Sequence, residues 1–77
     1  MKKSLYVQTQ DLIKRFYINR NHVRLLRIYL DRNLVGYIEK RKDGKYITYD
    51  NNGDTIGNKS SLDWALQKLA VNLLLNQ

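Results

Sequence analysis

The chain has 77 residues, no cysteine and a net charge of +7, which favours one small domain, residues 1–77, without disulfide bonds or thiolate chemistry. The single histidine, His22, has no cluster of Cys or His near it in the sequence to complete a metal site, and no apolar run approaches the roughly 18 residues of a membrane span. No set of residues with catalytic spacing is present, so the sequence predicts a non-catalytic protein with no cofactor, no small-molecule substrate and no membrane partner.

The N-terminal segment allows two interpretations. Thr9 is a suitable cap for a short helix over about residues 9–18, followed by a strand that begins near Val23. The alternation of apolar side chains is also typical of two strands, residues 12–18 and 23–30, joined by a short turn. We favour the helix and keep the two strands as the alternative.

The next segment predicts a β-hairpin. Residues 26–40 alternate between apolar and polar side chains, which is typical of strands with one buried face. With the turn at 31–33, Leu30 lies opposite Leu34, and Ile28 lies opposite Gly36. A shift of one residue would turn every apolar side chain outward, so the pattern favours this register.

Two further turns extend the hairpin into a meander. Asp43-Gly44 predicts a turn of two residues, because glycine supplies the positive φ that such a turn needs. This turn would place Lys40 opposite Ile47, and Asn52-Gly53 marks the turn into a short last strand. The result is an antiparallel β-meander of three to four strands.

This register divides the side chains of the sheet between two faces. The predicted inner face is apolar and holds Leu26, Ile28, Leu30, Leu34, Ile38, Ile47 and Tyr49, joined by Ile56. The predicted outer face is rich in arginine and tyrosine and holds Arg27, Tyr29, Val35, Tyr37, Glu39, Arg41, Tyr46 and Thr48.

The C-terminal segment predicts a helix over about residues 61–75. Ser60 and Ser61, followed by Asp63, are typical of a capped helix start. One helical face is apolar and holds Leu62, Ala65, Leu66, Leu69, Ala70 and Leu73. On the opposite side, a second apolar stripe of Trp64, Val71 and Leu75 needs a cover, either the N-terminal segment or another protein chain, such as a second copy or a host protein.

Together these elements predict an α+β fold, in which an antiparallel meander packs against one C-terminal helix and a basic N-terminal segment precedes it. Residues 1–42 contain eleven Lys or Arg against three Asp or Glu, while residues 43–77 contain three against four. The basic excess therefore lies in the first half, which suggests an anionic partner, with nucleic acid first among the candidates. Residues 1–5 contain no hydrophobic segment of a signal peptide, so a cytoplasmic location is expected.

Arginine and tyrosine on the outer face suggest that the sheet itself contacts nucleic acid, preferably DNA. Arginine bonds phosphate or guanine, and tyrosine stacks on bases. The candidate residues are Arg27, Tyr29, Tyr37, Arg41, Lys42, Lys45 and Tyr46. The alternative is that these side chains only cover the open side of a thin sheet and contact no ligand.

The residues 36–46, with Gly53 and then Ser61, Ala65 and Leu69, resemble the arm-binding N-terminal domains of tyrosine recombinases. The resemblance covers about 35 residues, roughly half of the chain, and these domains and their AP2-type relatives read DNA with a three-stranded sheet packed on one helix. It implies a free-standing DNA-binding protein, a regulator or accessory factor of a phage or another mobile element.

Two alternatives to a DNA-reading sheet remain. Residues 12–26 look like a helix-turn-helix of the excisionase type, in which Asn19 caps the second helix and Arg20, Asn21, His22 and Arg24 face DNA. The other alternative is a protein-interaction module, such as a phage-encoded inhibitor of a host protein, that docks or forms a homodimer through Trp64, Val71 and Leu75.

Overall fold

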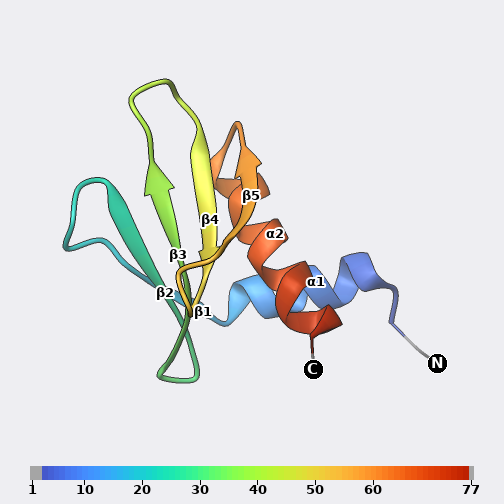
Figure 1. Cartoon of the computed structure of the whole chain (residues 1–77). Coiled ribbons are helices and arrows are strands. Elements are labelled where there is room, and N and C mark those ends of the chain that lie inside the picture. Colours follow the sequence, from blue (N-terminus) through green and yellow to red (C-terminus); the bar gives the residue numbers. More distant parts are fainter. Residues whose placement is uncertain (1–2, 77) are drawn as a thin grey trace.

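The computed structural model describes residues 3–76; Met1, Lys2 and Gln77 lie outside the described residues. A five-stranded antiparallel sheet in chain order carries both helices on one face (Figure 1). The elements are α1 (Leu5–Lys14), β1 (Phe16–Asn19), β2 (Leu25–Leu30), β3 (Asn33–Lys40), β4 (Tyr46–Asp50), β5 (Thr55–Lys59) and α2 (Leu62–Leu75). The predicted α+β class and meander are confirmed, with five strands and two helices in place of three or four strands and one helix.

The N-terminal segment combines the helix and the strand that were alternatives in the sequence. Ser4 caps α1, because its hydroxyl oxygen accepts the N–H of Val7 at 3.2 Å. Thr9, the predicted cap, lies inside the helix and is buried, and its hydroxyl donates to the Leu5 carbonyl at 2.7 Å. Neither helix in residues 3–76 is long and apolar enough to cross a membrane.

The predicted helix-turn-helix is wrong. Residues 16–19 pair with residues 27–30 as antiparallel strands, and residues 20–24 form the loop that joins them, so the segment predicted as the second helix of that motif is loop and strand. The alternation that decides this is visible in Phe16 and Ile18, which pack against the core from β1. A strand places Phe16 and Ile18 on the same face, whereas a helix over the same residues would direct them to different sides of its axis.

The core lies between α2 and the sheet. Helix α2 packs against β3, β4 and β5, and α1 packs against α2. Ser61 caps α2 by accepting the N–H of Trp64 at 3.3 Å, so the predicted start of the helix is confirmed to within one residue. The predicted apolar face of this helix is also confirmed, and the buried cluster consists of Leu26, Ile28, Ile38, Ala65, Leu66 and Leu69.

The turn between β3 and β4 holds three residues, 42–44, and not the two that Asp43-Gly44 predicted. The N–H of Gly44 donates to the Arg41 carbonyl at 3.2 Å, and the N–H of Arg41 donates to the Lys45 carbonyl at 2.9 Å. Gly44 has φ +84°, as expected for a type I turn closed by a left-handed glycine. The carboxylate of Asp43 adds a bond from the N–H of Lys45 at 3.0 Å.

One extra residue in this turn reverses the faces of β4. Lys40 lies opposite Tyr46, and Ile38 lies opposite Thr48, so the predicted pairing of Lys40 with Ile47 is wrong. Side chains of directly paired residues share a face. Tyr46 and Thr48 therefore lie on the helix-covered face, and the predicted inner residues Ile47 and Tyr49 lie on the other one.

A shorter turn and a bulge join β2 to β3. Asp31 and Arg32 form the turn with positive φ values of 50° and 70°, and Tyr29 pairs with Leu34. The predicted pairing of Leu30 with Leu34, and with it the inner position of Leu34, is therefore wrong. A bulge then restores the predicted pairing of Ile28 with Gly36, and it packs Val35, predicted to face outward, partly against the core.

This turn predicts that Arg32→Gly stabilises the protein. A non-glycine residue in the left-handed region costs about 1–2 kcal/mol, and glycine loses about 0.5–1 kcal/mol through its extra freedom when unfolded. We expect the free energy of unfolding to rise by about 0.5–1 kcal/mol, measured by urea unfolding. Asn33→Gly is the control: it lies in the strand, so it should lower stability.

Candidate functional site

The face of the sheet opposite the helices is uncovered within residues 3–76, and we call it the open face (Figure 1). Each of four neighbouring strands contributes one tyrosine to it: Tyr17, Tyr29, Tyr37 and Tyr49. The pairing arranges the open face in three rows across the strands, which are Tyr17, Tyr29 and Leu34; Asn19, Arg27, Tyr37, Tyr49 and Thr55; and Leu25, Glu39, Ile47 and Asn58.

The tyrosines of the open face form two cross-strand pairs. The ring centroids of Tyr17 and Tyr29 are 6.1 Å apart with the planes tilted by 48°, a distance at which aromatic rings attract each other. Tyr37 lies directly opposite Tyr49. Arg27 lies beside Tyr37 on the neighbouring strand, and no carboxylate of residues 3–76 lies within ion-pair distance of it.

The carboxylate of Glu39 is the one acidic group in the three rows of the open face, and it accepts a hydrogen bond from the Tyr49 hydroxyl at 2.8 Å. This bond favours the neutral phenol and raises the pKa of Tyr49 above its ordinary value, with burial as a second cause. The bond therefore contributes stability below the ordinary tyrosine pKa of about 10, and the contribution is lost as the pH rises through the raised value.

Removing the charge of Glu39 tests this assignment. We expect Glu39→Gln to lower the pKa of Tyr49 towards its ordinary value, because a neutral acceptor holds the phenol proton less strongly than a carboxylate. Ultraviolet absorbance of tyrosinate measures the titration, and subtraction of the curve of Tyr49→Phe assigns the signal to this ring. An unchanged midpoint would contradict the role given to Glu39.

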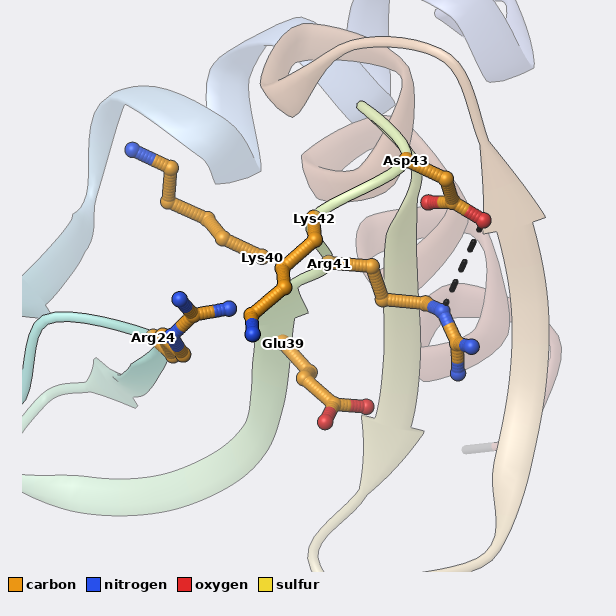
Figure 2. A pocket seen from close by; sticks show the side chains of 6 residues that line it. All are labelled: Arg24, Glu39, Lys40, Arg41, Lys42 and Asp43. Carbon is orange, nitrogen blue, oxygen red and sulfur yellow. Dashed lines mark ion pairs between the residues drawn. The ribbon is translucent and has the colours of Figure 1, made fainter.

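Positive charge collects where two loops meet at one end of the sheet. The loop between β1 and β2 and the loop between β3 and β4 are tied together by the N–H of Lys40, which donates to the Arg24 carbonyl at 2.7 Å. Both loops border an open hollow of about 350 Å³, lined by Arg24, Glu39, Lys40, Arg41, Lys42 and Asp43 (Figure 2). We call this region the basic end; its cations are Arg20, Arg24, Lys40, Arg41, Lys42 and Lys45.

The cations of the hollow point in different directions. Lys40 extends away from the other cations, Lys42 turns towards the guanidinium group of Arg24, and Arg41 turns towards Asp43 (Figure 2). The Arg41 Nε and Asp43 Oδ2 atoms are 3.8 Å apart, and both side chains are more than half exposed. Exposed ion pairs of this kind contribute little, so Arg41 remains available to a stronger anionic ligand.

The opposite end of the sheet has a different charge. The turn between β2 and β3 and the loop between β4 and β5 lie there, with Asp31, Asp50 and Asp54. Arg15 forms an ion pair with Asp31, which neutralises one of the few cations at this end. The charge difference between the two halves of the sequence therefore becomes, in the structure, a difference between the two ends of the sheet.

The structure separates the predicted nucleic-acid residues into two groups. Arg27, Tyr29 and Tyr37 lie on the open face, whereas Arg41, Lys42 and Lys45 lie in the basic end. The placement of Tyr46 on the outer face is wrong, because the three-residue turn puts it on the helix-covered face, partly buried against the core. Sequence reasoning missed Tyr17, Tyr49 and Lys40; of these, Tyr49 follows once the turn is given three residues.

The residues of the alternative DNA-binding motif form the loop between β1 and β2. His22 shapes this loop, because its Nδ1 atom accepts the N–H groups of Arg24 and Leu25, both at 3.2 Å. Asn21 donates its N–H to the Asn19 side chain at 2.9 Å. Of the predicted set Arg20, Asn21, His22 and Arg24, only Arg24 lines the hollow.

The predicted protein interface on α2 is divided. Trp64 is 56% exposed near the start of the helix and Leu75 is 69% exposed at its end, while Val71 is half-buried between them. Helix α1 packs against α2, as the prediction of cover by the N-terminal segment requires, but it leaves Trp64 and Leu75 accessible.

Comparison of the chain with protein-family models, with curated proteins and with solved structures found no match.

Proposed function

We propose that this protein binds nucleic acid, DNA in the first instance, without catalysing a reaction on it. The observation that carries the proposal is the basic end, where two loops far apart in the sequence bring Arg24, Lys40, Arg41 and Lys42 around one open hollow. Phosphate groups are the natural ligands for such a cluster, since most contacts to a nucleic-acid backbone come from Arg and Lys.

The position of the basic end supports a polymeric ligand over a small anion. The hollow is open, and Lys40 and Arg41 diverge from Arg24 and Lys42, so the four cations do not converge on one anion (Figure 2). Diverging cations suit a chain of phosphates that passes across the end of the sheet. The open face adjoins the basic end, so its tyrosines and Arg27 can contact the bases of such a chain.

A salt titration of the intact chain tests the proposal. Binding of fluorescein-labelled oligonucleotides of about 12 residues, single-stranded and duplex, is followed by fluorescence anisotropy between about 0.02 and 0.3 M salt. We expect the logarithm of the binding constant to fall linearly with the logarithm of salt concentration, with a slope of about −2 to −4 for three to five phosphate contacts. Absence of binding to every oligonucleotide at the lowest salt would exclude the proposal.

A second candidate function is binding of a protein, and the exposure of Trp64 favours it. Tryptophan is enriched at protein interfaces, and on α2 the exposed Leu75 accompanies it. Sizing chromatography of the wild type and of Trp64→Glu tests self-association, because the charged variant should elute later if a dimer forms through α2. Equal elution volumes at the mass of one chain would remove the homodimer.

A further inference from the structure

The four tyrosines of the open face lie on an oblique path that starts at the basic end. The row of Glu39 borders the basic end, the row of Tyr37 and Tyr49 comes next, and the row of Tyr17 and Tyr29 is farthest. With a rise of about 3.3 Å per residue, the row of Tyr17 and Tyr29 lies about 13 Å along the strands from the row of Glu39, and about 7 Å from the row of Tyr37 and Tyr49. Tyr17 is 65% exposed, so its ring is accessible to a ligand.

We infer that the open face binds a single strand of nucleic acid, with its phosphates in the basic end and successive bases stacked on the two tyrosine pairs. This inference rests on the proposed function and names the form of the ligand. Stacking on aromatic rings is tolerant of sequence, because every base has a flat π-face. Tyrosine rings in two pairs, with a positive groove beside them, are the combination by which proteins bind unpaired bases.

The width of the open face argues against a duplex. A major groove is about 12 Å wide and accepts an α-helix or a two-stranded ribbon. The tyrosines alone occupy four strands, which at about 4.8 Å between neighbours extend over more than 14 Å. The sheet is therefore too wide to enter the groove, and its tyrosines would meet phosphates and sugars and not base edges.

The charges of the open face agree with a path in which phosphates and bases are separated. Arg27 has no ion-pair partner in residues 3–76 and lies between Asn19 and Tyr37, so it can bond a phosphate or stack on a base. The Glu39 carboxylate also lines the hollow, where the four cations outnumber the acidic groups, but on the open face beside Tyr49 it would repel a phosphate. Phosphates therefore follow the cationic loops, and bases pass over the neutral rings.

Replacement of tyrosine by leucine tests the inference, since leucine keeps the apolar cover of the sheet and removes the ring. The ligands are labelled oligothymidine of about 12 nucleotides and a duplex of the same length. The variants are Tyr29→Leu and Tyr37→Leu, and the matched control is Tyr6→Leu, which changes an exposed tyrosine on α1. Circular dichroism and thermal unfolding verify that each variant is folded.

We expect the single strand to bind at least about tenfold more tightly than the duplex at about 0.1 M salt. Each tyrosine variant of the sheet should weaken single-strand binding by about 5- to 150-fold, the range for one stacked base, with the salt slope unchanged. Tyr6→Leu should bind as the wild type does. If oligouridine binds more tightly than oligothymidine, the result supports binding of a single strand and identifies RNA as the preferred nucleic acid.

Three results would overturn the inference while the proposed function stands: a duplex bound as tightly as the single strand, tyrosine variants that bind normally, or a dimer that the tyrosine variants dissociate. If neither form of nucleic acid binds at about 0.02 M salt, the proposed function fails together with the inference. The two failures are therefore distinguishable in one set of titrations.

Discussion

The double variant Arg24→Ala/Lys42→Ala should bind a single strand about 25-fold more weakly than the wild type at about 0.1 M salt. Both side chains line the hollow of the basic end and contribute from different loops (Figure 2). Each cation that contacts a phosphate of a single strand adds about 0.7 to the salt slope. The slope of the variant should therefore be smaller by about 1.4, which identifies the lost contacts as phosphate contacts.

A matched variant separates this local effect from the loss of net charge. Lys14→Ala/Arg32→Ala also removes one lysine and one arginine, both exposed and both outside the basic end. We expect its slope to equal that of the wild type and its affinity to change by less than about threefold. Both residues lie towards the opposite end of the sheet, about 20 Å along the strands from the phosphates in the basic end, and exposed charges more than a Debye length apart are largely screened. Equal losses in the two variants would show that net charge, and not the basic end, determines binding.

The sequence predicted those elements whose signals are local. Helix α2 has a serine cap and an apolar stripe of the right period, and both are present in the structure. The strand segments near Ile28 and Ile38 follow from alternation alone. The sequence did not decide between helix and strand in the N-terminal segment. Ten residues of helix are followed almost at once by four residues of strand, so neither the helical nor the strand periodicity extends over enough residues to be recognised.

Errors in the candidate site come from the turn lengths. Asp43-Gly44 is compatible with a two-residue and with a three-residue turn, and the difference decides whether Tyr46 or Tyr49 lies on the open face. Hydrogen bonds around Arg41, Asp43 and Lys45 stabilise the longer turn. The alternation of apolar and polar residues in β4 does not predict these bonds. The same kind of loop, closed by a glycine with φ +89°, joins β4 to β5.

The basic end was accessible to sequence reasoning only in part. The excess of positive charge before residue 43 is visible in the sequence, and it includes Arg41 and Lys42, which line the hollow. That Arg24 joins them depends on the antiparallel pairing of β2 with β3, which brings the start of one strand beside the end of the other. A cluster that forms by strand pairing has no signature in a linear sequence.

Gly36→Ala is the substitution with the largest expected effect on stability. A Cβ atom at this position would lie 2.5 Å from the Tyr49 carbonyl oxygen and 2.8 Å from Leu69 Cδ1. The oxygen belongs to the backbone of β4, which cannot move away without disturbing the ladder. Overpacking of this kind costs about 3 kcal/mol or more, a large fraction of the stability of so small a domain, and the Tm should fall by about 10–20 °C.

Gly57→Ala is the matched control, because Gly57 also lies on the helix-covered face. Its Cβ would lie 2.7 Å from Lys68 Cγ, and the other near atoms belong to the same flexible side chain, which can turn aside. We expect the free energy of unfolding to change by less than about 1 kcal/mol. Thermal and urea unfolding followed by circular dichroism compare the two variants, and similar losses in both would contradict the importance of the β4 contact.

A second substitution identifies which contact of Gly36→Ala is responsible. Leu69→Ala removes the side chain that the new methyl group would meet, but it leaves the Tyr49 carbonyl in place. If the backbone contact dominates, Gly36→Ala/Leu69→Ala remains at least as unstable as Gly36→Ala, since the cavity in the core adds its own cost of about 2–5 kcal/mol. Recovery of stability in the double variant would instead assign the clash to helix α2. Gly36 precedes Tyr37, and an added Cβ atom would meet the Tyr49 carbonyl oxygen. If the open face binds nucleic acid as proposed, a shift of this backbone should weaken binding in Gly36→Ala at temperatures where that variant is still folded, and binding should stay normal in Gly57→Ala.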